Sequence, residues 1–484
     1  MREMNINTKK LPLSFKDKAF WKTTISLGLP IAFQNMLSAS FSLVDTLMVS
    51  NLGEVPLSAT GMAGQWSWLL NMVLFGISSG SAVFISQYWG TKNLKGIRRT
   101  AGIAISTGLG ISLLFLIAAL VFPQTIISIF NQEPEVIKEG SKYLRIACLS
   151  YPATVINLLL SSTLRSTEHP KLPMTTSIIS ALANAILNYV LIFPAGLGVA
   201  GAAMATVISI WLNTILLLVI SAARKNILVA PIGEYLSFKF IDVVEFFKKA
   251  APVIANETMW GLGTVSYNVI FSNIGHQEYA AITIVRTFES FAMCFFWGLC
   301  NACCVVVGKS IGSGQIREGI RNTKRFLIIF PVLSALVGGV IILFRSPLVS
   351  IFNFGANISE YTIETAQWVL VIFAAWMIIR NIPYLLVVGI LRPGGDTLTA
   401  MLTEIGALWF FSLPMTFLAA NVWGLPFLAV YAVMYLCEDI PKAIIFLIYW
   451  RTGKWIRPVT EAGKQGLAEY INVDYTNIEY KNTK

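Results

Sequence analysis

The sequence predicts an all-α membrane protein, in which twelve transmembrane helices form two pseudo-symmetric lobes of six helices each. Three observations support this fold class. Hydrophobic residues make up 55% of the 484 residues and charged residues only 13%, whereas a soluble protein carries about 25% charged residues. Twelve apolar runs are long enough to span a bilayer, and the last six runs repeat the first six. Lipid, rather than water, is therefore the expected solvent for most of this chain.

Each predicted helix is an apolar run of about 20 residues or more, the length that crosses the hydrocarbon core of a bilayer. Pro and Gly occur inside several runs, and membrane helices tolerate both residues better than soluble helices do. In order along the chain, the runs cover residues 24–50, 57–86, 100–122, 140–164, 173–193, 198–222, 250–273, 279–307, 326–345, 364–390, 397–420 and 425–450.

Basic residues mark the loops on one side of the predicted membrane. Lys and Arg gather before the first run and after the second, fourth, sixth, eighth and last runs, while the opposite loops are poorer in them. The positive-inside rule thus predicts that both termini are cytoplasmic, in a multi-pass protein of the cell membrane. Because the basic residues lie in these loops, the net charge of +11 does not indicate a nucleic-acid partner.

The chain repeats itself after the sixth run. The segment LGLPIAFQN (27–35) matches KAAPVIANE (249–257), so that Pro30 pairs with Pro252, and the same offset pairs Gly90 with Gly312. Each half holds six runs and begins on the same side, so the repeat is parallel, a design of transporters that bind substrate between two lobes. Chance matching of Gly and Pro in apolar sequence is the alternative, and several matches at one offset disfavour it.

The repeat divides the chain into five predicted parts. They are a cytoplasmic N-terminal segment at 1–22, a first lobe at 23–222, a cytoplasmic linker at 223–247, a second lobe at 248–450 and a cytoplasmic tail at 451–484.

Asp45 is the one charged residue in the first run, and a carboxylate at that depth is costly in hydrocarbon. At about 100° per residue, Gln34, Ser38 and Asp45 lie on one face of the helix, which should point into the lobe or into a cavity. Pro30 removes a backbone hydrogen bond and permits a bend below this polar face. We therefore expect Pro30 and its repeat partner Pro252 to act as hinges.

Candidate partners for Asp45 lie in the fifth and sixth runs. Asn184 and Asn188 are four residues apart and so share one helix face, and Thr206 offers a hydroxyl on the sixth run. A carboxylate, two amides and a hydroxyl supply the oxygen ligands that a hard cation such as Na⁺ prefers. The same group can stabilise Asp45 while it exchanges a proton, because burial favours the neutral acid. An interhelical hydrogen-bond clamp is the structural alternative.

The second half does not copy this arrangement. Tyr267 stands where the repeat would place the equivalent of Asp45, while Glu257 lies one turn after Pro252, with Asn268 on the same face. Glu257 would suit a cationic substrate or a second cation site, and its structural alternative is a pairing with Arg286. From these features we expect substrate contacts from Glu257, Gln34, Trp66, Tyr267, Asn268 and Arg286.

Other polar residues in apolar runs suggest structural roles. Arg286 and Glu289 are three residues apart and are expected to pair with each other, and Asp396 is a plausible N-cap of the eleventh helix. Aromatic and Met residues of the second and eighth runs, Trp66 and Met293 among them, either line an adaptable pocket or pack as core. Network members or helix-end groups are expected at Arg380, Glu404, Glu438 and Asp439.

The motifs of soluble enzymes are missing from the sequence. There is no Walker A motif, no Rossmann glycine pattern and no HExxH zinc motif, so we expect no enzyme activity and no cofactor. Without an ATP site, an ion gradient must supply the energy for transport. All six cysteines lie in apolar runs without metal-ligand spacing, and we expect small buried hydrophobes rather than disulfides.

Four stretches together resemble the multidrug and toxic compound extrusion (MATE) family, over about residues 20–455. They are LGLP…N…VDT…LG in the first helix, LRSTEHPKLPM after the fourth, N…LNYVLIFP.GLGVAGAAMAT over the fifth and sixth, and GILRPGGDT after the tenth. The resemblance implies the MATE fold of the MOP superfamily, with two lobes around a central cavity that opens to either side in turn. It also implies a monomer that expels cationic or amphipathic compounds against Na⁺ or H⁺ entry.

The resemblance also assigns residues. Asp45 matches the family's first-helix aspartate, while Asn184, Asn188 and Thr206 match its amino-lobe cation site. Glu257 matches the acid found on the seventh helix of many bacterial members. One position departs: some members carry an Asp on the tenth helix for a carboxy-lobe Na⁺ site, where this sequence has Asn381 or a neighbour. That departure favours the amino lobe as the coupling site.

Two other functions compete with this interpretation. A lipid-linked saccharide flippase of the same superfamily would carry more basic residues in its cavity to meet phosphates, whereas the deep first-helix charges here are acids. A channel or a receptor is the second rival, and the two-lobe repeat with paired acids argues against it. The sequence leaves Na⁺ and H⁺ equally open as the coupling ion.

Overall fold

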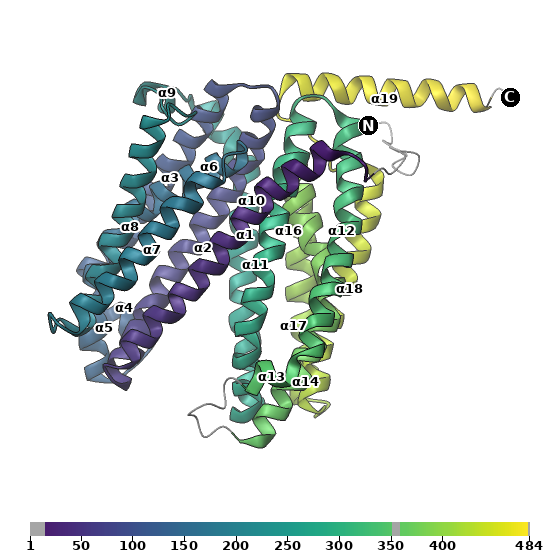
Figure 1. Ribbon diagram of the computed structural model, residues 1–484. Helices are drawn as coiled ribbons and strands as arrows, with labels where there is room; N and C mark the ends of the chain where they lie inside the picture. Colours follow the sequence, from purple (N-terminus) through teal and green to yellow (C-terminus); the bar gives the residue numbers. More distant parts are fainter. Residues whose placement is uncertain (1–14, 351–358, 483–484) are drawn as a thin grey trace. The chain divides into compact units, whose positions relative to one another are not determined.

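The computed structural model describes residues 15–350 and 359–482, and every regular element in these two ranges is a helix. The first half of the chain forms α1 (Lys18–Ser50), α2 (Glu54–Gly90), α3 (Leu94–Val121), α4 (Pro123–Ser128), α5 (Pro134–Ala147), η2 (Cys148–Ser150), α6 (Tyr151–Ser166), α7 (Lys171–Ile192), α8 (Gly198–Ala223) and α9 (Ile232–Tyr235). The second half forms α10 (Phe240–Ile274), α11 (His276–Gly312), α12 (Ile316–Leu343), α13 (Arg345–Ser350), α14 (Glu360–Tyr384), η4 (Leu385–Leu391), α15 (Arg392–Gly394), α16 (Thr397–Ile405), η5 (Gly406–Ser412), α17 (Leu413–Asn421), α18 (Phe427–Thr452) and α19 (Glu461–Asn482) (Figure 1).

All twelve predicted apolar runs are helical. Within the described ranges, ten helical stretches are long and apolar enough to cross a membrane. The other two predicted runs form α10, with 35 residues, and α18, with 26 residues. These two helices carry polar groups inside their apolar stretch, Glu257 in α10 and Glu438, Asp439 and Lys442 in α18.

The predicted repeat is visible in the lengths and the spacing of the helices. The helices α2 and α11 both have 37 residues, and they begin 222 residues apart, at Glu54 and His276. The helices α3 and α12 both have 28 residues and keep the same separation. The short helices α4 and α13 have 6 residues each. The two halves thus share one succession of elements as far as α13.

The halves differ after that point. The first half passes from α5 to α6 through the 3₁₀ turn η2, whereas the second half continues from α14 into η4, a π-helical segment of 7 residues. A second π-helical segment, η5, interrupts the eleventh run between α16 and α17. Because π-helical turns are rare and concentrate at functional sites, η4 and η5 make the second half a candidate location for such a site.

The chain forms two compact units. One, here called the Asp45 unit, comprises Leu29–Ile85 and Asn93–Ile254. The other, here called the Glu257 unit, comprises the described residues within Met1–Gly28, Ser86–Lys92 and Ala255–Lys484. The boundary between the two units falls inside α1 next to Pro30 and inside α10 next to Pro252. Both helices are nevertheless continuous through these prolines. The five-part division expected from the sequence remains a prediction.

In the Asp45 unit, α7 lies beside α8, α3 lies beside α6, and α5 also packs on α8. Small apolar clusters lie among the buried residues of this unit. One joins Leu160, Leu164, Leu172 and Leu217 with neighbours, and a second joins Val49, Ile192 and Ala202 with partly buried groups that include Tyr143. The second cluster lies close in sequence to both Asp45 and Asn188.

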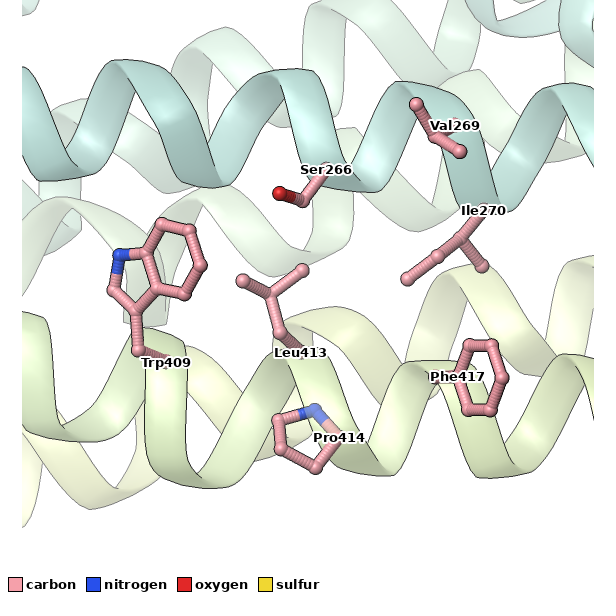
Figure 2. Close-up of a pocket in the computed structure, with 7 residues that line it drawn as sticks. All are labelled: Ser266, Val269, Ile270, Trp409, Leu413, Pro414 and Phe417. Carbon is pink, nitrogen blue, oxygen red and sulfur yellow. The ribbon is translucent and has the colours of Figure 1, made fainter.

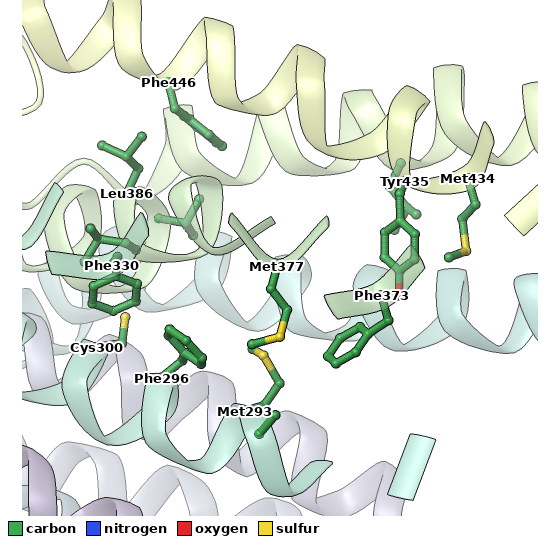
Figure 3. Close-up of a cluster of buried hydrophobic side chains, with 14 of the residues drawn as sticks. Met293, Phe296, Cys300, Phe330, Phe373, Met377, Leu386, Met434, Tyr435 and Phe446 are labelled. Carbon is green, nitrogen blue, oxygen red and sulfur yellow. The ribbon is translucent and has the colours of Figure 1, made fainter. Parts of the chain in front are cut away.

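The Glu257 unit holds the larger core, formed by α10, α11, α12, α14 and α18 with the π-helical segments. Phe296 and Phe330 meet with ring centroids 5.8 Å apart, and Figure 3 shows Met293 and Met377 pointing toward each other. Met293 is therefore a core residue, which is the structural alternative expected for it. All six cysteines are free thiols among the described residues, and Cys300 and Cys303 are fully buried in this core.

The repeat-related residues Gly90 and Gly312 meet at one helix crossing of the Glu257 unit. A Cβ atom on Gly90 would collide with the backbone oxygen of Lys309, and one on Gly312 would collide with the backbone of Gln87. The ends of α2 and α11 therefore approach backbone to backbone, which only glycine permits. The Gln87 side chain ties the end of α2 to two other segments, since its amide donates to the Pro393 oxygen at 2.8 Å and accepts from the Val459 N–H at 2.7 Å.

Two described segments outside the predicted spans, the linker and the start of the tail, also form packed structure. The predicted linker 223–247 contains α9 and the start of α10, and it is tied to α3 by Arg98 on Glu234 at 2.7 Å and Arg99 on Asp242 at 3.2 Å. After α18, the fully buried Trp455 packs against Gly394, and α19 follows. These segments are thus packed parts of the two units.

Candidate functional site

The candidate site in the Asp45 unit is built where α1 meets α7. The Asn188 amide nitrogen donates to Asp45 Oδ1 at 2.6 Å. Eleven residues earlier on both helices, the Gln34 amide donates to the Ser177 hydroxyl at 2.8 Å. The two helices therefore run in parallel at a constant register, and the polar face predicted for α1 does point into its own unit.

Asn184 completes the amide pair. When its amide nitrogen faces Asp45, that nitrogen lies 2.8 Å from Oδ1 and 3.0 Å from Oδ2, and its oxygen accepts from the Ser209 hydroxyl at 3.1 Å. This orientation gives both polar ends of the Asn184 amide a complementary partner, so it is the favoured one. Asp45 is thereby held by two neutral amides, and the Asn188 oxygen is buried without a hydrogen-bond partner.

Thr206 is linked to this group through Tyr143. The Thr206 hydroxyl donates to the Ala202 carbonyl within α8 at 3.1 Å, and the Tyr143 side chain of α5 hydrogen-bonds Thr206 while interacting with the charge of Asp45. Sequence reasoning missed Tyr143 and Ser209. Neither residue carries charge, and spacing along one helix cannot reveal a hydroxyl that another helix supplies.

Trp66 lies elsewhere in the Asp45 unit. Its indole N–H donates to the Phe115 carbonyl at 3.3 Å, and the two rings lie 4.7 Å apart. This contact joins α2 to α3, so packing between these two helices explains the position of Trp66 in this structure.

Glu257 is held by a different partner from the one expected. Arg392 Nη2 lies 2.6 Å from Glu257 Oε1, and both side chains are largely buried. The expected alternative, a pairing of Glu257 with Arg286, is therefore wrong. Beside this ion pair, the Asn256 amide donates to Glu404, whose charge interacts with both members of the pair.

The expected pairing of Arg286 with Glu289 is also wrong. Arg286 donates to the Asn268 oxygen on α10, and Glu289 forms an ion pair with Arg380 on α14. The spacing of three residues along α11 allowed the pairing, but α10 and α14 offer partners directly across the helix interface. Asp396 behaves as expected, since it caps α16 by accepting from the Thr399 N–H at 3.3 Å.

Tyr267, at the repeat position of Asp45, is a buried hydrogen-bonding residue. Its hydroxyl donates to the Glu438 carboxylate at 3.0 Å and lies 2.6 Å from the Ser412 hydroxyl. Glu438 is also bridged to Lys442 at 2.7 Å. The predicted substrate residues of the second half thus belong to a network of polar and charged side chains.

A hollow of about 400 Å³ lies between α10 and the η5–α17 segment. Figure 2 shows Ser266 and Ile270 of α10 on the side of Trp409, Leu413 and Phe417. Val269 also lines the hollow, and the lining is mostly apolar. None of the predicted site residues lines this hollow. The charged side chains of the network therefore do not line the hollow, although Ser266 adjoins Tyr267 in sequence.

The Asp45 group has the chemistry of a site for one small cation. Across residues 15–350 and 359–482, no group of three or more His, Cys, Asp and Glu side chains is placed to hold a metal ion. One carboxylate with neutral amide and hydroxyl oxygens suits Na⁺, and an isolated buried carboxylate suits a proton. The Asn188 oxygen, on the amide that donates to Asp45, is a buried acceptor without a hydrogen-bond partner.

Comparison with known families finds the same repeat. The family model MatE matches the chain twice, at residues 30–190 and 252–418, so that the two matches begin at Pro30 and Pro252. The chain is similar to the probable multidrug resistance protein NorM of Thermotoga maritima, with 25% identity over 448 residues, 90% of this chain and 93% of that protein. It is also similar to the probable multidrug resistance protein YoeA of Bacillus subtilis, with 24% identity over 441 residues, 88% of this chain and 93% of the relative.

Solved structures share the fold. A MATE transporter from Vibrio cholerae matches with a TM-score of 0.80 at 18% identity, over 92% of this chain and 98% of that one. A MOP superfamily transporter from Pyrococcus furiosus matches with a TM-score of 0.82 at 15% identity, over 90% of this chain and 97% of that one. The predicted all-α membrane fold is thereby confirmed.

Proposed function

The chain belongs to the MATE family of membrane transporters, and on this premise we propose that it is a secondary active exporter of cationic or amphipathic compounds, driven by Na⁺ or H⁺ entry. The relatives described above carry names that refer to multidrug resistance, which supports efflux of small molecules as the activity. The observation that carries the proposal is the Asp45 carboxylate, held inside an apolar helix by the amides of Asn184 and Asn188.

The coupling role of Asp45 follows from electrostatics. An ionised carboxylate in a membrane interior is costly, and two amide hydrogen bonds offset only part of that cost. A bound Na⁺ or a proton removes the charge, so the occupied and empty states of Asp45 differ strongly in free energy. A transporter can convert this difference into a preference for one conformation. Asn184, Asn188 and Thr206 then tune the affinity for the coupling ion.

The prolines are proposed to supply the moving parts. Pro30 and Pro252 each remove a backbone hydrogen bond from a helix interior. The boundary between the two compact units also falls beside each proline, between Gly28 and Leu29 and between Ile254 and Ala255. A bend at these positions would let one helix respond to the state of Asp45.

For the substrate, we propose that Glu257 meets the cationic group in a state in which Arg392 has withdrawn. In the present structure Arg392 neutralises Glu257, so the cationic group would replace Arg392 as the counter-ion. The further proposed substrate contacts are Gln34, Trp66, Tyr267, Asn268 and Arg286.

The charged groups argue against the rival activity of a saccharide flippase. Such a protein needs cationic side chains that are open to phosphate. Here Arg286, Arg380 and Arg392 are engaged with Asn268, Glu289 and Glu257 respectively.

Efflux from vesicles tests the proposal. The purified protein is reconstituted and loaded with a cationic fluorescent dye, and a Na⁺ gradient or a pH gradient is imposed separately. We expect one of the two gradients to drive dye movement against its own concentration gradient. Movement only down the dye gradient, under both conditions, would indicate a channel and would contradict the proposal.

A further inference from the structure

The Glu257 unit contains a second group of interior charges, and the proposed function uses only part of it. Nine charged side chains lie in its membrane helices and contact one another, a neighbouring amide or, for Asp439, the Trp376 indole. Five are acids, namely Glu257, Glu289, Glu404, Glu438 and Asp439, and four are bases, namely Arg286, Arg380, Arg392 and Lys442. Full ionisation would leave one net negative charge. In a low-dielectric interior that charge calls for one proton or one bound cation.

The ion pairs show which acids carry the excess negative charge. Glu257 is bridged to Arg392, Glu289 to Arg380 and Glu438 to Lys442. Two acids, Glu404 and Asp439, are left outside these three ion pairs.

Asp439 is the more isolated of these two carboxylates. Its side chain is 5% exposed, and Oδ2 accepts from the neutral indole N–H of Trp376 at 3.1 Å. Glu404 is less buried and lies within the field of both Arg392 and Lys442. A carboxylate with a neutral donor and almost no water is unfavourable in its charged form.

The neighbours of Asp439 strengthen this conclusion. The adjacent Glu438 keeps its charge because it holds Lys442 at 2.7 Å and accepts from the Tyr267 hydroxyl at 3.0 Å. A second negative charge beside it would be repelled. The cations that face Asp439 are Arg380 of α14 and Lys442 of α18, and each is already bridged to another acid.

The elements that pack on α18 place few other titratable groups near Asp439. They are α14, α16, α17, η4 and η5, and they contribute Arg380 and, through Lys442, Glu404. Further titratable groups nearby are Tyr267 of α10, Glu289 of α11 through Arg380, and Tyr435 of α18.

We propose that Asp439 is a proton-binding site of the second half, separate from Asp45, and that it holds its proton in the conformation described here. The step is a simple exchange, in which the Asp439 carboxylic acid gives a proton to water and becomes a carboxylate beside Glu438. This assignment does not depend on antiport, because the protonation state of Asp439 can be measured in the purified protein when no ion gradient is imposed.

Infrared spectroscopy of the full-length protein tests the assignment. A protonated carboxylic acid has a carbonyl band that is distinct from the carboxylate bands and shifts in D₂O. Spectra are compared in the Asp45→Asn background, so that Asp45 itself contributes no such band. We expect the band at neutral pH in Na⁺-free buffer and its loss in Asp439→Asn. We also expect it to weaken in Glu438→Gln, which removes the neighbouring negative charge and frees Lys442 to pair with Asp439.

Two further variants make the result decisive. Trp376→Phe removes the hydrogen bond to Oδ2 and should shift the band to higher frequency without abolishing it, which a role in packing alone would not produce. Glu404→Gln should leave the band unchanged. A band that persists in Asp439→Asn, disappears in Glu404→Gln or never appears would overturn the proposal, whether or not dye efflux is gradient-driven.

Discussion

Arg392 lies 2.6 Å from Glu257 inside the Glu257 unit, and both side chains are almost removed from solvent. A buried ion pair of this kind contributes little net stability, but the loss of one partner leaves an uncompensated charge. The ion pair therefore determines how substitutions of Glu257 or Arg392 are expected to change the stability of the protein.

Single substitutions at the pair are therefore predicted to be more damaging than the double substitution. Glu257→Gln or Arg392→Gln alone should cost about 3–5 kcal/mol of stability, whereas the double variant should lose less than the sum of the two. Apparent unfolding temperatures in detergent check this. Additive losses would show that the two side chains do not interact energetically.

The amides around Asp45 are predicted to set the affinity for the coupling ion. Asn188→Ala removes the 2.6 Å hydrogen bond to Asp45 and the neighbouring unpartnered oxygen. The concentration of coupling ion that gives half-maximal efflux should rise several-fold, while maximal efflux persists. Asn213→Ala is the matched control, because that amide faces Asn157 at 3.5 Å. The same ion dependence in both variants would mark Asn188 as a clamp only.

The crossing of α2 and α11 is predicted to tolerate no side chain. Gly312→Ala places a methyl group against the Gln87 backbone, and Gly90→Ala places one against the Lys309 oxygen. Each should cost about 1–3 kcal/mol through forced backbone movement. Gly339→Ala in α12, where nothing lies within 4 Å of the new methyl group, is the control and should be neutral or stabilising. Equal thermal stability of all three variants would argue against this close contact.

Asp17 is predicted to add pH-dependent stability at the start of α1. The backbone N–H of Phe20 and the Arg325 guanidinium, 3.1 Å away, hold the pKa of Asp17 below its usual value. Its contribution is therefore fully present above the unfolded-chain pKa of about 4, and it is lost as the pH falls through the lower folded-state pKa. Because Asp17 is about a third exposed, this contribution should be at most about 1 kcal/mol.

The measurement compares thermal unfolding of the wild type and Asp17→Asn between about pH 6 and about pH 3, the interval that spans the carboxyl pKa values. The wild type should be more stable near pH 6, and the difference should shrink as the pH falls. A difference that grows on acidification would have the wrong sign for this interaction.

Helical periodicity predicted which residues of the Asp45 group share a helix face, but it missed Tyr143 and Ser209. Asn184 and Asn188 share a face at a spacing of four residues, and Gln34 lies with Asp45 on the face of α1 that meets α7. The repeat placed Pro30 and Pro252 in the equivalent helices α1 and α10, and Gly90 and Gly312 at the ends of α2 and α11, which have 37 residues each.

The charge partners of the second half could not be predicted in this way. Spacing along α11 suggested Arg286 with Glu289, yet both residues bind across helix interfaces, to Asn268 and Arg380. Glu257 and Arg392 lie on elements far apart in sequence, and the π-helical segment η4 directly precedes Arg392. Such pairings depend on tertiary packing, which one sequence does not reveal.

The central claim is that the Asp45 carboxylate carries the coupling ion. Asn at position 45 keeps the size and the hydrogen bonding but cannot bind a proton or offer a negative charge to Na⁺. Dye efflux is measured in vesicles that contain equal amounts of folded wild type or Asp45→Asn, under the gradient that drives the wild type. We predict that uphill efflux is lost in Asp45→Asn while the purified variant still binds the dye. Gradient-driven efflux at the wild-type rate in that variant would contradict the account.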